Sequence, residues 1–254
     1  MNMPQNRLLN RCLTALLLLA LSTMACAEDR VAVATLLWEP YVTTNTLNGG
    51  VATEIVTKAF RLGGVQAEVM HMPWKDAIEK TEKGIYQAIY PAYFSLDRAG
   101  KFLISEPFLC SPVVLVARAG SAISYNGLSS LEPYRIGVVA GYANAEAFDD
   151  ATHLKKITNS SDLDNLQKLK AGVIDLAASD KLVAMSLIRN HPDILGSLED
   201  YRFMSPPLGN RDMYVMFPKQ LKGSKRRLKR FNKGLKKLRD DGGMESIIHT
   251  HGFR

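Results

Sequence analysis

The segments EKTEKGIYQAIY (residues 79–90) and LQKLKAGVIDLAAS (residues 166–179) decide the fold, because each reads as the end of a helix, a lysine-glycine turn and a β-strand. Outward from them, strand-like runs alternate with helical runs: VAVATLLW precedes a helix over 50–62, and RIGVVAG precedes one over 161–171. This order predicts an α/β protein of two similar lobes, each a sheet flanked by helices. Facing lobes of this kind enclose a cleft into which strand ends and helix N-termini point.

Residues 1–27 have the features of a cleavable signal peptide and are expected to lie outside the fold. Arginines precede an apolar stretch at 13–21 that is too short to span a bilayer, and small residues at 25–27 suit cleavage. Acylation of Cys26 is disfavoured, because the residues before Ala25 do not match the leucine and small residue of a lipoprotein signal. The mature protein is therefore predicted to be periplasmic and not membrane-spanning.

Cleavage would leave Cys110 as the only cysteine. A lone cysteine excludes an intramolecular disulfide, a cysteine-based zinc site and a redox pair within the mature chain. Its surroundings, FLCSPVVLV, read as a buried strand, so we expect a small core residue rather than a nucleophile.

The formal net charge is +7, or +5 without the two arginines of the signal peptide, and most of this positive excess lies between Lys219 and Arg239. Apolar residues recur at helical spacing within it and predict a basic helix with one apolar stripe, formed by Leu228, Phe231, Leu235 and Leu238. The charged face is interpreted as a solvated outer surface, or as a docking surface for an acidic partner or anionic lipid. Nucleic acid is not expected as a partner outside the cytoplasm.

One arginine, Arg98, follows the strand-like run AIYPAYF (88–94) on a polar turn. A guanidinium at the end of a buried strand can bind a carboxylate through two parallel hydrogen bonds. The alternative is a surface arginine that caps the turn, and spacing alone does not exclude it.

Six motifs extend over nearly all of the mature chain. They are WEPY (38–41), PWKDAIEKTEKG (73–84), SLDR with FLISEPF (95–108), RIGVVAGY (135–142), LQKLKAGVIDLAASD (166–180) and FNKGLKKLRDDGGMESIIHTHG (231–252). Together they resemble the bacterial extracellular solute-binding proteins of family 3, the periplasmic amino-acid-binding proteins. The resemblance implies the two-lobed periplasmic binding protein-like II fold, with a ligand cleft between lobes that are joined by two hinge strands.

The resemblance also implies the lobe boundaries. Lobe 1 would be discontinuous, comprising residues 28–109 and 212–254, and lobe 2 would comprise residues 113–208. The hinges would lie at 108–112 and 209–213, where prolines favour extended chain. Closure of a monomer about these hinges would trap the ligand away from water.

Three residues match ligand-binding positions of the family, and a fourth is predicted to belong to the same site. Arg98 matches the arginine that binds a ligand α-carboxylate, and Asp180 matches the lobe 2 acid that accepts the ligand's ammonium group. Trp38 matches the aromatic residue that stacks on the ligand side chain, and Tyr41 of the same WEPY motif is expected beside it. Taken alone, Asp180 fits a helix N-cap before residues 181–188 better than a ligand-binding residue, and Trp38 fits core packing as well as ligand stacking.

Two tyrosines depart from the family pattern. Tyr93 stands five residues before the arginine, where a serine or threonine is common, and Pro91 replaces a glycine. Tyr142 follows Gly141 where the family has threonine or serine. A phenol still donates a hydrogen bond, but its ring fills volume and offers a π face. We expect Tyr93 and Tyr142 to line a pocket for a smaller, differently shaped or more cationic ligand than an ordinary amino acid. The alternative is a pocket that no longer binds amino acids.

These observations predict a non-enzymatic protein that captures a small polar solute, an amino acid or related carboxylate, for an ABC permease or a sensor. No cofactor or metal is expected, since the sequence lacks a glycine-rich phosphate loop, a paired-histidine motif and a G-x-S-x-G elbow. One alternative is a signalling or interaction protein that uses the basic helix over 224–239. The other is a periplasmic enzyme resembling cyclohexadienyl dehydratase, with Glu39, Asp180 or Lys181 as acid or base.

Overall fold

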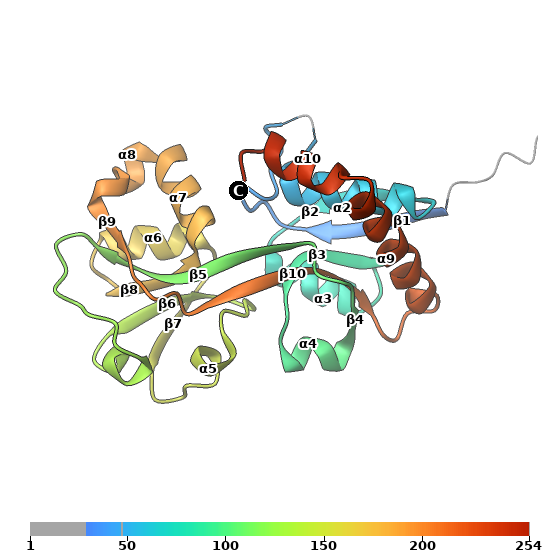
Figure 1. The fold of residues 1–254 in the computed structure, drawn as a ribbon. Helices are drawn as coiled ribbons and strands as arrows, with labels where there is room; N and C mark the ends of the chain where they lie inside the picture. Colours follow the sequence, from blue (N-terminus) through green and yellow to red (C-terminus); the bar gives the residue numbers. More distant parts are fainter. Residues whose placement is uncertain (1–28, 47, 254) are drawn as a thin grey trace, which may run out of the picture.

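The computed structural model describes residues 29–46 and 48–253. The predicted signal peptide, residues 1–27, lies outside the described residues. Within the described part, no helix is both long enough and apolar enough to cross a membrane. The elements form the expected α/β fold, and Figure 1 shows two bodies of strands and helices joined by two long strands.

The first part of the chain builds the right-hand body of Figure 1. Strand β1 pairs in parallel with β2 and with β3, and each connection contains a helix, as parallel pairing requires. The elements, in order, are β1 (Asp29–Thr35), α2 (Val51–Leu62), β2 (Val65–His71), α3 (Trp74–Glu82), β3 (Ala88–Tyr93), α4 (Leu96–Lys101) and β4 (Phe102–Ile104).

The middle of the chain repeats this arrangement in the left-hand body. Strand β6 pairs in parallel with β7 and β8. The elements, in order, are β5 (Leu109–Arg118), η1 (Leu128–Leu131), β6 (Arg135–Val139), α5 (Glu146–Asp149), β7 (Lys155–Asn159), α6 (Asp162–Lys170), β8 (Leu176–Asp180), α7 (Lys181–Asn190), α8 (Pro192–Leu195), η2 (Leu198–Asp200) and β9 (Tyr201–Phe203). The chain then returns through β10 (Gly209–Pro218) to α9 (Ser224–Asp240) and α10 (Gly243–Thr250).

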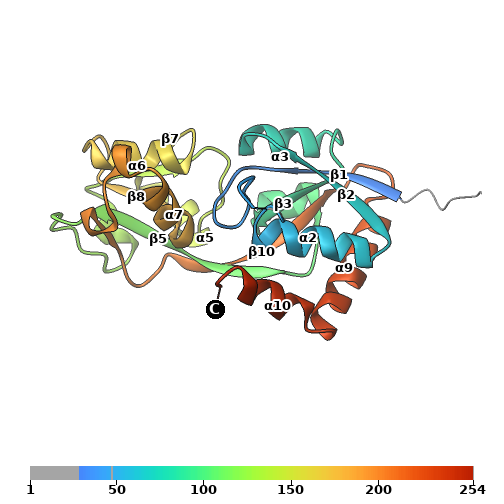
Figure 2. The same ribbon diagram turned by 90° about the horizontal axis from the view of Figure 1, so that it is seen from above.

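Strands β5 and β10 connect the two bodies (Figure 2). They pair antiparallel from Met213 opposite Leu109 to Gly209 opposite Val113. They also occupy the centre of the mixed sheet, whose order is β2-β1-β3-β10-β5-β8-β6-β7. The two segments predicted as hinges are thus hydrogen-bonded to each other, while the exact lobe boundaries remain a prediction.

Each body has its own hydrophobic core. Most residues of the largest buried cluster come from positions 31–108 and 213–247. The residues of two further buried clusters come only from positions 114–204. Separate cores on either side of two strands are what a two-lobed molecule with a closable cleft requires.

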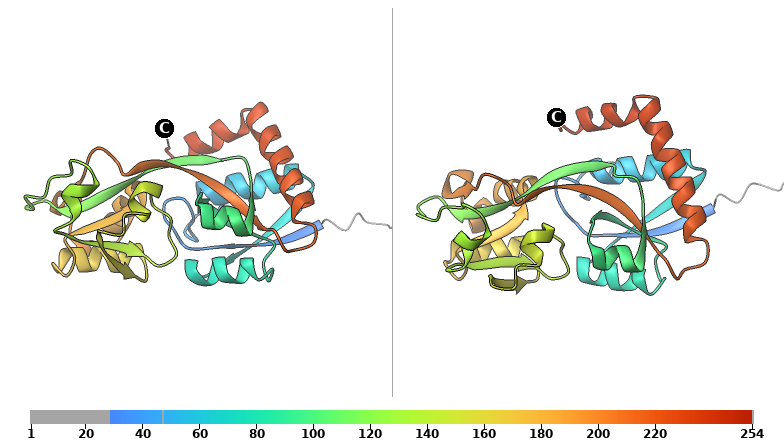
Figure 3. Two further views of the ribbon diagram at one scale, coloured as in Figure 1. Left: turned by 90° about the horizontal axis from the view of Figure 1, so that it is seen from below. Right: turned by 60° about the horizontal axis from the view of Figure 1, so that its bottom comes forward.

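The basic segment forms α9, which lies along α2 (Figure 3). Its predicted apolar stripe is buried at Phe231, Leu235 and Leu238. The two helices approach most closely at Gly234, where a Cβ atom would lie 1.8 Å from the carbonyl oxygen of Ala59. Lysines cover the opposite face, including the exposed Lys225, Lys229, Lys233, Lys236 and Lys237.

Two local predictions differ from the structure. Arg98 lies within the short helix α4, not on a turn, because Ser95 caps the helix by accepting a hydrogen bond from the Arg98 backbone N–H. Cys110 lies on a strand as predicted, but its side chain is exposed. Side chains alternate along β5, so buried Ser111 points inward while its neighbour Cys110 points to solvent.

Candidate functional site

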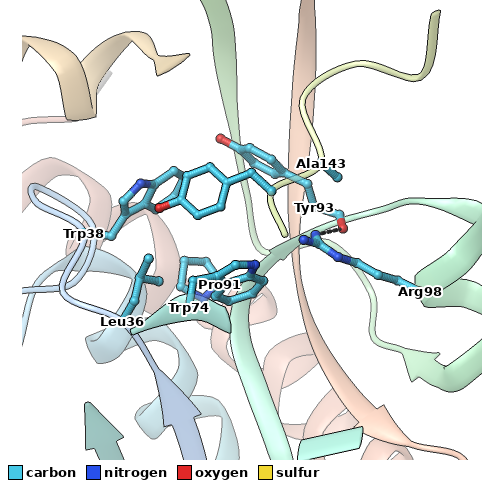
Figure 4. Close-up of a pocket in the computed structure, with 8 residues that line it drawn as sticks. Leu36, Trp38, Trp74, Pro91, Tyr93, Arg98 and Ala143 are labelled. Carbon is cyan, nitrogen blue, oxygen red and sulfur yellow. Dashed lines mark hydrogen bonds between the residues drawn. The ribbon is translucent and has the colours of Figure 1, made fainter. Parts of the chain in front are cut away.

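A small cavity lies between the two bodies at the ends of β1, β3 and β6. Its volume is about 20 Å³, enough for a single water. Figure 4 shows aromatic side chains crowding around it, with Arg98 at one side. The lining residues are Leu36, Trp38, Trp74, Pro91, Tyr93, Arg98, Tyr142 and Ala143.

Arg98 holds a buried positive charge at this cavity, with 4% of its surface exposed. Its guanidinium donates to the carbonyl oxygens of Tyr93, at 2.6 Å, and of Gly141, at 2.7 Å, and lies 5.1 Å from the ring centre of Trp74. Burial, with a smaller contribution from the nearby Arg211, lowers the pKa of Arg98 to about 10, and the charge of Asp149 offsets part of this effect. The group is therefore a partly desolvated cation at neutral pH, bonded to backbone from both bodies.

Asp162, at the start of α6, is a second buried charged group near the cavity. Its carboxylate accepts hydrogen bonds from Ser179 Oγ at 2.8 Å, Tyr142 OH at 3.0 Å and Trp38 Nε1 at 3.2 Å. Trp38 belongs to the right-hand body, so this last bond crosses the cleft. Trp74 makes a similar crossing, donating to the carbonyl oxygen of Gly141 at 2.9 Å.

Asp180 ends β8 and caps α7, accepting from the backbone N–H groups of Leu182 and Val183. This confirms the predicted N-cap. The same carboxylate also accepts from three hydroxyl groups, those of Tyr41, Tyr93 and Ser111. Tyr41 and Tyr93 reach it across the cleft from the right-hand body.

Burial raises the pKa of both carboxyl groups, Asp162 and Asp180, and their hydrogen-bond donors offset part of this effect. Burial also raises the pKa of Tyr93 and Tyr142, and the adjacent carboxylates add to the increase. The phenols therefore stay protonated at neutral pH and act as hydrogen-bond donors.

A model of the bacterial extracellular solute-binding proteins, family 3, matches residues 31–253. The chain belongs to this family. Among solved structures, a histidine kinase sensor domain with similarity to periplasmic binding proteins gives a TM-score of 0.76 at 19% identity, over 88% of this chain and 96% of that chain. The GluR0 ligand-binding core from Nostoc punctiforme, in complex with L-glutamate, gives 0.71 at 16% identity, over 87% and 98%.

The substrate binding protein of an amino acid ABC transporter gives a TM-score of 0.72 at 19% identity, over 87% of this chain and 98% of that chain. At these identities the likeness establishes a shared fold. No curated protein sequence matches the chain.

The residues that this family 3 protein was predicted to use fall into two groups. Trp38, Tyr93, Arg98 and Tyr142 line the cavity together. Tyr41 and Asp180 do not line it, because Tyr93 separates Asp180 from the cavity. The backbone carbonyl of Tyr93 accepts from Arg98, and its hydroxyl donates to Asp180. Their roles toward a ligand remain predictions.

Two of the residues considered as an acid or base lie away from the cavity lining. Glu39 accepts hydrogen bonds from Thr43 at 2.8 Å and from Asn190 at 2.6 Å. Lys181 begins α7, beside the cap residue Asp180. In the described ranges, no three or more histidine, cysteine or acidic side chains are grouped to hold a metal ion.

Asp162 was not predicted. In the sequence it follows Ser161 at a helix start, where an acidic residue is common for its effect on the helix dipole. Nothing in that local pattern indicates a hydrogen bond to an indole 124 residues away.

Proposed function

We propose that this family 3 protein captures a small polar solute, an amino acid or a related carboxylate, in the cleft between its two bodies. Arg98 would bind the carboxylate, and Trp38, Tyr93 and Tyr142 would surround the rest of the solute. The bodies would close about the predicted hinges at 108–112 and 209–213, which fall where β5 and β10 pair.

The burial of Arg98 carries this proposal. Its charge is nearly removed from water, yet its hydrogen-bond partners are the backbone carbonyls of Tyr93 and Gly141, and it forms no salt bridge with a described carboxylate. A buried charge without a carboxylate in direct contact is costly, which favours the arrival of an anion at this position. A guanidinium can accommodate a carboxylate through further N–H groups in its planar fork.

Hydrogen bonds across the cleft would stabilise the closed arrangement. Trp38 donates to Asp162, Tyr93 donates to Asp180, and Arg98 donates to Gly141. A hydrogen bond to a charged group contributes about 1.5–3 kcal/mol. Together such bonds are large enough to couple ligand capture to closure.

We also propose a periplasmic location and delivery of the solute to an ABC permease or to a sensor. The location rests on residues 1–27, and the family is one of extracellular solute-binding proteins. Solved structures of similar fold include both an ABC transporter's binding protein and a kinase sensor domain. A pull-down of the mature chain with a candidate permease or sensor, with and without solute, would distinguish the two.

Calorimetry tests the proposed capture. The mature protein, denatured and refolded to remove carried-over solute, is titrated with a panel of amino acids and simple carboxylates. Arg98→Lys should weaken binding about 10- to 150-fold, the equivalent of one charged hydrogen bond. Arg118→Lys is the matched control, because Arg118 also donates to backbone carbonyls, those of Leu169 and Ile174, but does not line the cavity. Equal affinity of both variants and wild type would place the binding site elsewhere.

A further inference from the structure

The carboxylate of Asp180 is saturated with hydrogen bonds. A carboxylate offers about four lone-pair sites. The five donors that reach Asp180 are the hydroxyls of Tyr41, Tyr93 and Ser111 and the backbone N–H groups of Leu182 and Val183. No acceptor site is therefore left for the ammonium group of a solute.

The Tyr93 hydroxyl is held in place, so it does not readily give up its position on Asp180. The ring is only 8% exposed. The Trp38 ring is edge-on to it at a centroid separation of 5.8 Å, and the guanidinium carbon of Arg211 lies 5.9 Å from its centre. Its hydroxyl oxygen also lies 2.8 Å from Ser111 Oγ, and both hydroxyls donate to Asp180. Four contacts would have to change before an ammonium group could replace this phenol.

The cavity itself presents one charge, and that charge is positive. Arg98 is the only lysine, arginine or acidic residue in its lining; the rest is aromatic or apolar. The carboxylates of Asp162 and Asp180 bond to the hydroxyls of Tyr142 and Tyr93 and take no part in the lining. An ammonium group beside the solute's own carboxylate would thus face a guanidinium and aromatic rings, without a carboxylate to replace its lost hydration.

We infer that the solute is a small carboxylate with an apolar body and no α-ammonium group, and that Asp180 is a structural acceptor in this pocket rather than a ligand for ammonium. This inference rests on the proposed binding of a carboxylate at Arg98. It differs from the role that the family resemblance implies for Asp180. The small volume of the cavity, about 20 Å³, favours short acids.

Matched pairs of solutes that differ only in the amino group test the inference. The refolded mature protein is titrated with propanoate and alanine, 3-methylbutanoate and valine, and 3-phenylpropanoate and phenylalanine. The acid without the amino group should bind at least about tenfold more tightly in the pair that fits best, the cost of one unsatisfied charged group. Tighter binding of the amino acid would overturn the inference and leave the proposed capture standing. Failure of every member to bind would overturn both.

Tyr93→Phe tests the reason for the preference. The variant keeps the ring and leaves Oδ2 of Asp180 with one short donor, Ser111, and the long contact of 3.3 Å that Tyr41 shares between both oxygens. An acceptor site on Oδ2 therefore opens, and the affinity ratio should shift toward the amino acid. Tyr90→Phe is the control, because the buried Tyr90 hydroxyl bonds to Thr53 at 3.0 Å and does not line the cavity. An unchanged ratio in a folded Tyr93→Phe protein would contradict the saturation argument. If that variant does not fold, the wild-type ratios alone decide the inference.

Discussion

Asp162 should stabilise the folded protein mainly through its hydrogen bonds rather than through its charge. Its carboxylate is 4% exposed and accepts from Trp38, Tyr142 and Ser179. Asp162→Ala leaves three donors without a partner, at about 1–3 kcal/mol each. We expect a loss of about 3–6 kcal/mol, because the two hydroxyls can rotate toward other acceptors while the indole N–H cannot.

Asp162→Asn is the matched variant. Its carbonyl oxygen can still accept from Trp38 and Tyr142, and its amide can donate to the Ser179 hydroxyl, so the loss should stay below about 1 kcal/mol. Urea denaturation at neutral pH, followed by circular dichroism, measures both values. Equal unfolding free energies for the two variants would refute the reasoning, because they would show that the three hydrogen bonds to Asp162 contribute nothing.

Three further predictions concern packing, pH and thiol chemistry. Gly234→Ala should lower the unfolding free energy by about 1–3 kcal/mol in urea denaturation, since its Cβ would overlap the Ala59 backbone, whereas the exposed Lys233→Ala should change it by less than about 0.5 kcal/mol. Burial raises the pKa of Asp162, so the native state binds its proton more tightly than the unfolded chain. Relative to Asp162→Asn, wild type should therefore gain stability as the pH falls toward the ordinary aspartate pKa of about 4 and lose it as the pH rises; the opposite slope would contradict this. Cys110 should react with a thiol reagent in the native protein, because its side chain is exposed. The reaction should be slower than that of free cysteine, because partial burial and Asp212 raise the pKa of the thiol. Reaction only after urea is added would contradict the exposure of the side chain.

The α/β order was predictable because hydrophobic periodicity and glycine turns act locally. The parallel strands around 88–93 and 176–180 follow their helices as the two echoing segments indicated. The N-cap at Asp180 was predictable for the same reason, since a cap involves only the next two or three residues. Helix α4 was missed, because six residues with an internal glycine, Gly100, carry no apolar periodicity.

The cavity was only partly predictable. Family motifs placed Arg98, Trp38 and the two tyrosines near one another, and they line one space. The hydrogen bonding of Asp162 and the saturation of Asp180 depend on side chains far apart in the chain, and the exposure of Cys110 depends on which face of β5 is covered. Tertiary packing determines these hydrogen bonds and this exposure, and it cannot be predicted from local sequence patterns.

The two cross-cleft indoles give the molecule its own optical probe. The sequence contains two tryptophans, Trp38 and Trp74, and both line the cavity. Each donates its N–H to the opposite body, and Tyr142 meets both rings edge-on at 6.4 and 6.2 Å. All tryptophan emission therefore originates at the site, without background from elsewhere. Separation of the bodies would expose both indoles to water at once, so a shift of the emission spectrum would report the open population without any label.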